Sequence, residues 1–264
     1  MFIINHNKKI IYWSKGKLGT TTLRVMLDSD GPLEHLGPWI NGDSFDVTEI
    51  DWSKYKDYTI FCPIRKPRDR YVSGIIEDIH KFYKTFTGSR GHFSLNHFNN
   101  SNDWENSINE LISFTHADMS LGNTYHVANW LWEIIYIACK NDNVNVFHIS
   151  DWDQHYQDHY NLQKTSIEKI NEIPTYIKDI VGNIFNKESF LQTQLDFYLY
   201  NEEKLYSMIL ESFVNKTTDF NLVNNEYTNF FHQYLEYFKE KETQTSHSKY
   251  IRKIKELIDS LENR

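Results

Sequence analysis

One stretch near the N-terminus constrains the fold more than any other, because it reads as a strand, a tight turn and a helix in succession. Residues 10–13 form a β-prone apolar run, Gly16 and Gly19 punctuate the turn, and apolar residues follow at helical spacing from Leu23. Such a turn directs several backbone N–H groups and a helix N-terminus at one point, where both favour negative charge. Residues 14–22 are therefore predicted to form an anion-binding loop.

The side chains of this loop strengthen the prediction. Lys17 adds a mobile positive charge, and the threonines that follow Gly19 add hydroxyl donors. The residues expected to contact the anion are Lys15, Gly16, Lys17, Leu18, Gly19, Thr20, Thr21 and Thr22.

A second basic stretch follows another predicted strand. Residues 58–64 are almost continuously apolar, as in a central parallel strand, and Arg65 comes directly after them. Pro67 can begin a helix, since its missing N–H costs nothing in the first turn, and Ser73 falls well inside that helix. The three arginines and one lysine of residues 65–70 need a phosphate or neighbouring carboxylates to neutralise them. A phosphate site and a solvated helix start therefore both stay open.

The composition limits the partners that these stretches can serve. The chain has 264 residues, of which 40% are hydrophobic, and this is typical of a globular protein with a sizeable core. Its formal net charge of −8 argues against binding to nucleic acid or an anionic membrane, so an anionic ligand must be met locally. No apolar run is long enough to cross a membrane and no secretory signal pattern is seen, which favours a cytoplasmic protein.

The cysteines and histidines point to no metal. Cys62 and Cys139 each stand in an apolar run, and buried thiols suit a reducing cytoplasm better than a disulfide framework. The twelve histidines show no zinc-ligand spacing, so no metal site is expected.

Together, the two basic stretches resemble the nucleotide-binding motifs of the sulfotransferase superfamily that uses 3′-phosphoadenosine 5′-phosphosulfate (PAPS). The family's Lys-x-Gly-Thr-Thr loop is matched by residues 17–21, and its strand-following arginine and serine are matched by Arg65 and Ser73. Both motifs occur in the family's order, each after a predicted strand and before a predicted helix. The carbohydrate sulfotransferases are the most similar branch.

This resemblance implies an α/β, three-layer, P-loop-like fold with a mainly parallel central sheet and a helical C-terminal portion. It also implies transfer of a sulfuryl group from PAPS to an acceptor hydroxyl, on a carbohydrate, with adenosine 3′,5′-bisphosphate (PAP) as product and no metal required. By the same resemblance, Lys17 would stabilise the leaving group, Thr20 and Thr21 would hold the 5′-phosphate, and Arg65 and Ser73 would hold the 3′-phosphate.

Candidates for the base and for the acceptor site come from loops. Residues 32–38 are predicted to be a loop whose Pro and Gly residues keep His35, the first candidate base, and Glu34, the second, outside any regular element. A solvated loop is the alternative. Arg90 and His92, in a polar insertion, are candidates for contact with the acceptor. His126, at the start of a later helix, is a further candidate because its position resembles that of a histidine in the carbohydrate sulfotransferases.

Two other functions are alternatives to this one. A P-loop nucleotide kinase would need Gly-Lys followed by Ser or Thr, whereas here Lys17 precedes Gly19 by two residues and no magnesium-binding acid is evident. A non-catalytic nucleotide-binding protein that retains the fold is the second alternative.

No linker or repeat divides the chain, so a single domain over residues 1–264 is expected. Residues 1–150 would form an α/β nucleotide-binding core, and residues 151–264 a mostly helical portion. The further elements predicted are strands at 45–50 and 144–149, and helices at 104–114, 127–138, 190–213 and 251–261. The last of these helices is amphipathic and can pack on the domain or on a second subunit in a homodimer.

Overall fold

The computed structural model describes residues 2–15, 18, 33–36, 47–74, 131–152, 154–155, 175, 179, 182–183, 189–239 and 245–264. The chain divides into two compact units. The first contains Met1–Arg65, Trp130–Glu168 and Lys204–Arg264, and the second contains Lys66–Asn129 and Lys169–Glu203. The first unit thus joins the sheet to the C-terminal helices, across the predicted division at residue 150.

An open sheet forms the centre of the first unit. Its strand order is β3-β1-β2-β4-β5, in which β1 is antiparallel to both neighbours and the β2–β4 and β4–β5 pairs are parallel. Four of these strands therefore run in one direction, which confirms an α/β protein with a mostly parallel open sheet. The strands are β1 Phe2–Asn5, β2 Ile10–Trp13, β3 Glu34–Leu36, β4 Thr59–Ile64 and β5 Val144–His148.

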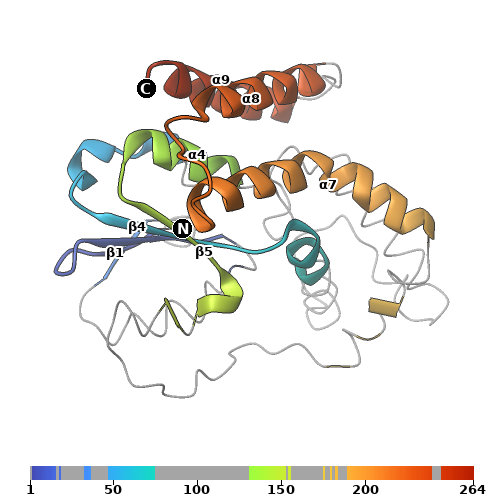
Figure 1. The fold of residues 1–264 in the computed structure, drawn as a ribbon, viewed down its shortest axis with the longest axis horizontal. Helices are drawn as coiled ribbons and strands as arrows, with labels where there is room; N and C mark the ends of the chain where they lie inside the picture. The colour runs from blue at the N-terminus through green and yellow to red at the C-terminus, as the bar shows by residue number, and fades with distance from the viewer. Residues whose placement is uncertain are drawn as a thin grey trace. The chain divides into compact units, whose positions relative to one another are not determined.

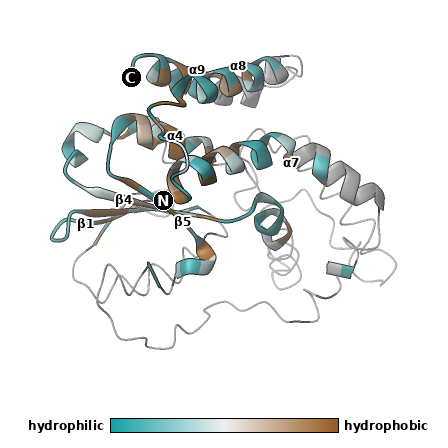
Figure 2. Cartoon of the chain, in the orientation of Figure 1, coloured by the Kyte–Doolittle hydropathy of each residue, from teal (hydrophilic) through white to brown (hydrophobic). Residues whose placement is uncertain are grey.

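The two faces of the sheet bury alternate residues of each strand. Ile11 and Trp13 belong to the larger buried cluster on one face, and Tyr12 belongs to a smaller aromatic cluster on the other. The same alternation places Cys62 on the first face and Phe61 on the second. Because both faces are apolar, the central strands β2 and β4 read as continuous apolar runs in the sequence, and much of the centre of the sheet is brown in Figure 2.

Helices cover the face that carries the larger cluster. In Figure 1, α4 lies next to the sheet, and the antiparallel pair of α8 and α9 lies over α4. Residues 131–138 of α4 are all buried, as expected for a helix between two layers. The long helices of the described ranges are α4 Leu131–Lys140, α7 Ser189–Ile209, α8 Asn224–Lys239 and α9 Thr245–Glu262, and a π-helical turn, Leu210–Val214, extends α7.

Most predicted elements within the described residues are confirmed. The strands predicted at 10–13, 58–64 and 144–149 correspond to β2, β4 and β5. The predicted helices at 190–213 and 251–261 correspond to α7 with its π-helical turn and to α9, and the described part of the predicted helix at 127–138 belongs to α4. The helix predicted at 104–114 lies outside the described residues.

Two predictions in the first third of the chain are wrong. The predicted strand at 45–50 contains a 3-10 helix over Val47–Glu49, because the Trp52 indole N–H donates to the Val47 carbonyl at 3.2 Å and folds the segment back. The predicted loop at 32–38 contains strand β3, which pairs with β1. Strand β1 itself was not predicted, although its turn carries a recognisable signal: the Asn5 side chain accepts from the Lys8 N–H at 3.0 Å.

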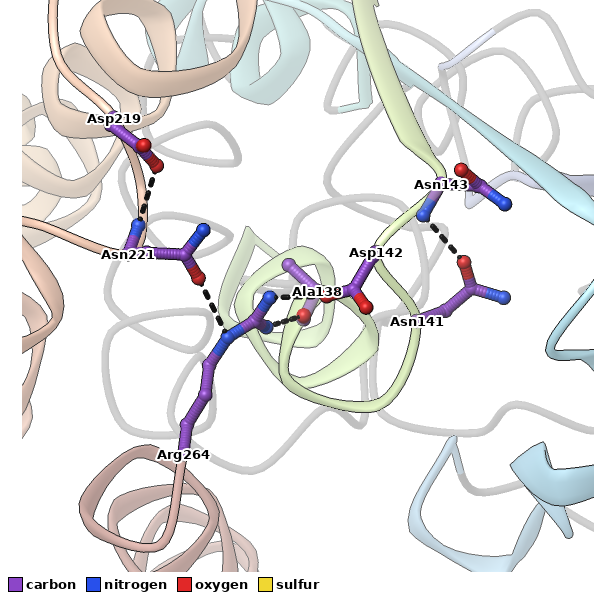
Figure 3. Close-up of polar contacts among 7 residues, drawn as sticks. All are labelled: Ala138, Asn141, Asp142, Asn143, Asp219, Asn221 and Arg264. Carbon is purple, nitrogen blue, oxygen red and sulfur yellow. Dashed lines mark hydrogen bonds and ion pairs between the residues drawn. The ribbon is translucent and has the colours of Figure 1, made fainter.

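Arg264 connects the end of α9 to the end of α4. Figure 3 shows its guanidinium directed at the Ala138 carbonyl, one of the last carbonyls of α4, to which it donates a hydrogen bond. It also donates to Asn221 at 3.0 Å and binds the Asp142 carboxylate at 2.6 Å. A cation at a helix C-terminus satisfies carbonyls that have no partner within the helix.

Candidate functional site

The strand order itself creates a candidate binding edge. Strands β2 and β4 are parallel neighbours, with Tyr12 opposite Phe61. The chain continues from β2 to β3 on one side of this pair, and from β4 to β5 on the other side. In open α/β sheets, two neighbouring strands whose connections lead to opposite sides leave a crevice at their carboxyl ends, where ligands bind. The two stretches predicted to bind anions, which begin at Ser14 and Arg65, follow these two strand ends.

The described part of the first stretch forms a closed turn directly after β2. The Leu18 N–H donates to the Lys15 carbonyl at 3.2 Å, and the Ser14 hydroxyl donates to the Leu18 carbonyl at 3.4 Å. Ser14, Lys15 and Leu18 are all buried. The turn predicted to follow the strand is therefore present, while its other predicted ligands, Gly16, Lys17, Gly19, Thr20, Thr21 and Thr22, lie outside the described residues.

A buried ionic network anchors this turn to α4. The Lys15 ammonium lies 2.8 Å from the Glu133 carboxylate, and these side chains are 6% and 3% exposed. The other oxygen of Glu133 accepts from the Trp13 indole N–H at 2.7 Å. The Lys15 side chain is thus directed at α4. If Lys15 contacts the anion as predicted, it would do so through its backbone.

Glu133 was not predicted from the sequence, although its position carries a signal. Glu133 is the one acid among the buried residues of α4. An acid in an otherwise apolar helix face must be paired if it is to remain buried, and this need predicts a cationic partner.

The second stretch continues from unit one into unit two. Arg65 is half-buried and directly follows β4. Residues 67–74 are helical in the described part of the second unit, so Pro67 begins a helix as predicted. Ser73 is half-buried on this helix.

Carboxylates of α7 neutralise two of the arginines of this stretch. Arg68 binds Asp196 at 2.7 Å, and its backbone N–H donates to Glu203 at 3.2 Å. Arg70 binds Glu202 at 2.8 Å in a pair whose side chains are only 4% and 2% exposed. These three acids were not recognised as partners in the sequence, because no local pattern links positions so far apart along the chain.

Glu202 is held in an apolar environment. Burial raises the pKa of its carboxyl, and this effect exceeds the opposing effect of the Arg70 guanidinium. One of its oxygens, Oε2, has no hydrogen-bond partner among the residues that the structure describes.

The structure does not bring Glu34 together with Arg65. Glu34 pairs with Ile4 near the β1–β2 turn, where Lys9 accepts a backbone hydrogen bond from Thr59 at the start of β4. Its carboxylate binds His6 Nε2 at 2.7 Å, and His6 Nδ1 is hydrogen-bonded to the Tyr58 hydroxyl at 2.9 Å. Glu34 therefore lies at the amino ends of β2 and β4, at the opposite edge from the crevice.

The remaining predicted residues are placed as follows. The backbone of His35 is part of β3 and pairs with Ile3. Arg90, His92 and His126 lie outside the described residues. Within the described ranges, no group of three or more metal-binding side chains occurs, and no helix is long and apolar enough to cross a membrane.

Neither cysteine forms a disulfide, and burial dominates the environment of both thiols. It raises the pKa of Cys62 well above its ordinary value and that of Cys139 to about 11. Both thiols are therefore protonated at neutral pH, and neither suits the role of a nucleophile.

No family model matches this chain, and no curated protein or solved structure matches it either. The sheet topology and the chemistry of the two stretches are therefore the basis for a functional proposal.

Proposed function

We propose that this protein is a PAPS-dependent sulfotransferase that sulfates a carbohydrate hydroxyl. The observation that carries the proposal is the arrangement of β2 and β4, which are parallel neighbours whose onward connections lead to opposite sides of the sheet. The stretches that resemble the two PAPS motifs follow these two strands, so one nucleotide could contact both.

The donor set near this edge suits an anion with two phosphate positions. The acid next to the loop after β2, Glu133, is already paired with Lys15 and so would repel such a ligand less. We assign the 5′-phosphosulfate to the loop amides with Thr20 and Thr21, and the 3′-phosphate to Arg65 and Ser73.

PAPS would supply an activated sulfuryl group. Its bond to the 5′-phosphate oxygen breaks as a bond to the acceptor oxygen forms, and the acceptor proton passes to a base. Lys17 would stabilise the negative charge that develops on the departing phosphate, and the remaining catalysis would come from positioning. Glu34 lies level with Ile11, near the amino end of β2, whereas His35 lies level with Tyr12, one residue nearer the carboxyl end, so His35 is the candidate that we retain for the base.

The first experiment measures thermal unfolding with PAP and, separately, with ATP and magnesium. PAP is expected to raise the melting temperature, since a ligand that binds the native state stabilises it. Arg65→Ala should remove most of this effect, whereas Lys66→Ala, an exposed neighbour outside the motif, should retain it. Equal stabilisation by ATP with magnesium would instead favour a kinase.

The second experiment separates binding from turnover. Lys17→Ala is expected to bind PAP but to lose turnover with radiolabelled PAPS and a panel of saccharide acceptors. Unchanged turnover would remove Lys17 from its assigned role. If the unaltered chain binds PAP but transfers no label to any acceptor, a non-catalytic nucleotide-binding protein is the better description.

A further inference from the structure

The carboxylate of Glu133 joins three parts of the first unit. It belongs to α4, binds the ammonium of Lys15 after β2 at 2.8 Å, and accepts from the indole of Trp13 at the end of β2 at 2.7 Å. Trp13 is fully buried, and the Lys15 and Glu133 side chains are 6% and 3% exposed. Both oxygens of one carboxylate are thus used within a water-excluded layer.

This arrangement holds the start of the loop to α4 at two points, Trp13 and Lys15. Trp13 belongs to the strand and Lys15 to the turn, so a single side chain sets both relative to α4. The Lys15 backbone carbonyl in turn accepts a hydrogen bond from the Leu18 N–H at 3.2 Å. The position of the Leu18 amide therefore depends on where the Lys15 side chain is held.

We infer that Glu133 is a positioning residue for the anion-binding loop, and that Lys15 anchors this loop through its side chain instead of contacting the ligand with it. The inference rests on the proposed function for the identity of the ligand, but the anchoring itself does not. It divides the lysines of the loop into an anchor, Lys15, and a charge for the substrate, Lys17.

Physical chemistry favours this division of roles. A lysine whose ammonium is buried against a carboxylate offers little net charge to an external anion, because the two fields cancel at a distance. The same pair is sensitive to geometry, since each charge depends on the other for its solvation. A shift of α4 would therefore be transmitted to the loop.

The main test uses Glu133→Gln in the full chain. Gln keeps an acceptor for the Trp13 indole but removes the charge that holds Lys15. The matched control is Ile137→Val, which perturbs another fully buried residue of α4. The readouts are hydrogen exchange of the Leu18 amide and the dissociation constant of PAP.

Glu133→Gln is expected to accelerate Leu18 exchange by about tenfold, since local opening of the turn becomes easier. It should also weaken PAP binding by about tenfold, as expected when binding groups are displaced. The control should leave both readouts unchanged. If Glu133→Gln behaves like the control in both, the inference is overturned.

A double variant, Lys15→Met with Glu133→Gln, separates anchoring from charge neutralisation and replaces the single variant if that one does not fold. It removes both charges at nearly constant volume, which buried ion pairs often tolerate. Under the inference, the double variant folds, yet Leu18 still exchanges fast and PAP still binds weakly. Native exchange and native affinity in the double variant would overturn it.

The two proposals can fail separately. If PAP does not bind the unaltered chain while Glu133→Gln still accelerates Leu18 exchange, the proposed function fails and the anchoring stands. If PAP binds normally to the unaltered chain and to Glu133→Gln alike, and exchange is unchanged, the anchoring fails and the function stands.

Discussion

At the scale of single residues, the arginines of the second stretch differ in how deeply their ion pairs are buried. Arg68 and Arg70 bind acids of α7, and the Arg70–Glu202 pair is almost fully buried. Burial dominates over the ion pair at Glu202 and keeps the pKa of its carboxyl raised. The two members of this pair should therefore respond differently to substitution.

Arg70→Met is expected to destabilise the protein by about 3 kcal/mol, because it leaves the Glu202 charge buried without its partner. Glu202→Gln should cost much less, because an uncharged amide can still accept from Arg70. Asp196→Asn, at a partly exposed pair, is the control and should cost under about 1 kcal/mol. Urea unfolding at pH 7 measures all three, and equal losses for Arg70→Met and Glu202→Gln would contradict the argument.

The same carboxyl predicts a pH dependence. Since the folded-state pKa of Glu202 is raised from 4.5, the folded protein holds this proton more tightly than the unfolded chain does. Its contribution to stability is then fully present below the unfolded-state pKa and is lost as pH rises through the folded-state pKa. The free energy of unfolding of the unaltered protein, minus that of Glu202→Gln, should fall between pH 4.5 and neutral pH. A difference that rises with pH would contradict the assigned direction.

At the scale of elements, strand β3 decides which residues can serve the crevice. It pairs antiparallel with β1, and its first residue, Glu34, is bound to His6 beside the β1–β2 turn. Both side chains are about half exposed, so this contact adds little stability.

Glu34→Gln is accordingly expected to retain most of the turnover that the proposed enzyme shows with PAPS, and to change the free energy of unfolding by under about 1 kcal/mol. His35→Ala, compared in the same assay, should reduce turnover if His35 is the base. Loss of turnover in Glu34→Gln with full activity in His35→Ala would return the role to Glu34.

The elements that could be predicted from the sequence are those whose apolar residues run continuously or recur at a fixed spacing. Strands β2, β4 and β5 and the helices α7 and α9 carry long apolar patterns, which few other structures can satisfy. Strand β3 is three residues long and has no such pattern, since it is held by pairing with β1. Val47–Glu49 alternates like a strand, but a hydrogen bond from the Trp52 indole, which the apolar pattern does not predict, bends it.

The candidate site was predictable to a similar degree. Local spacing was enough to recognise the turn after β2 and the helix that starts at Pro67. It could not assign Lys15 to Glu133, nor Arg70 to Glu202, because each pair joins segments more than a hundred residues apart. Such pairing depends on the tertiary fold, which spacing along the chain does not encode.

At the scale of the whole molecule, the residue pair after α9 connects this helix to α4 and to the segment before α8, all within the first unit. Arg264 contacts Ala138, Asp142 and Asn221, and its guanidinium lies 5.0 Å from the centre of the Phe220 ring. The apolar residues Ile254, Leu257 and Leu261 of α9 are fully buried in the larger cluster.

Arg264→Ala is expected to lower the free energy of unfolding by about 1–3 kcal/mol, because it leaves the Ala138 carbonyl and the end of α4 without this donor. Arg252→Ala provides the control, since its pair with Glu256 is exposed and lies within one helix. That variant should lose under about 0.5 kcal/mol. Similar losses in urea unfolding for both variants would show that the Arg264 contacts are no stronger than a surface ion pair.

The position of α9 has a consequence for synthesis. A ribosome completes β1 first and α9 much later, yet one buried cluster contains residues of both. While α9 is missing, the apolar side of α4 that it covers would face solvent in the nascent chain. Folding of this unit therefore cannot finish before α9 has been synthesised, and the uncovered side of α4 is a surface that a chaperone would bind in the growing chain.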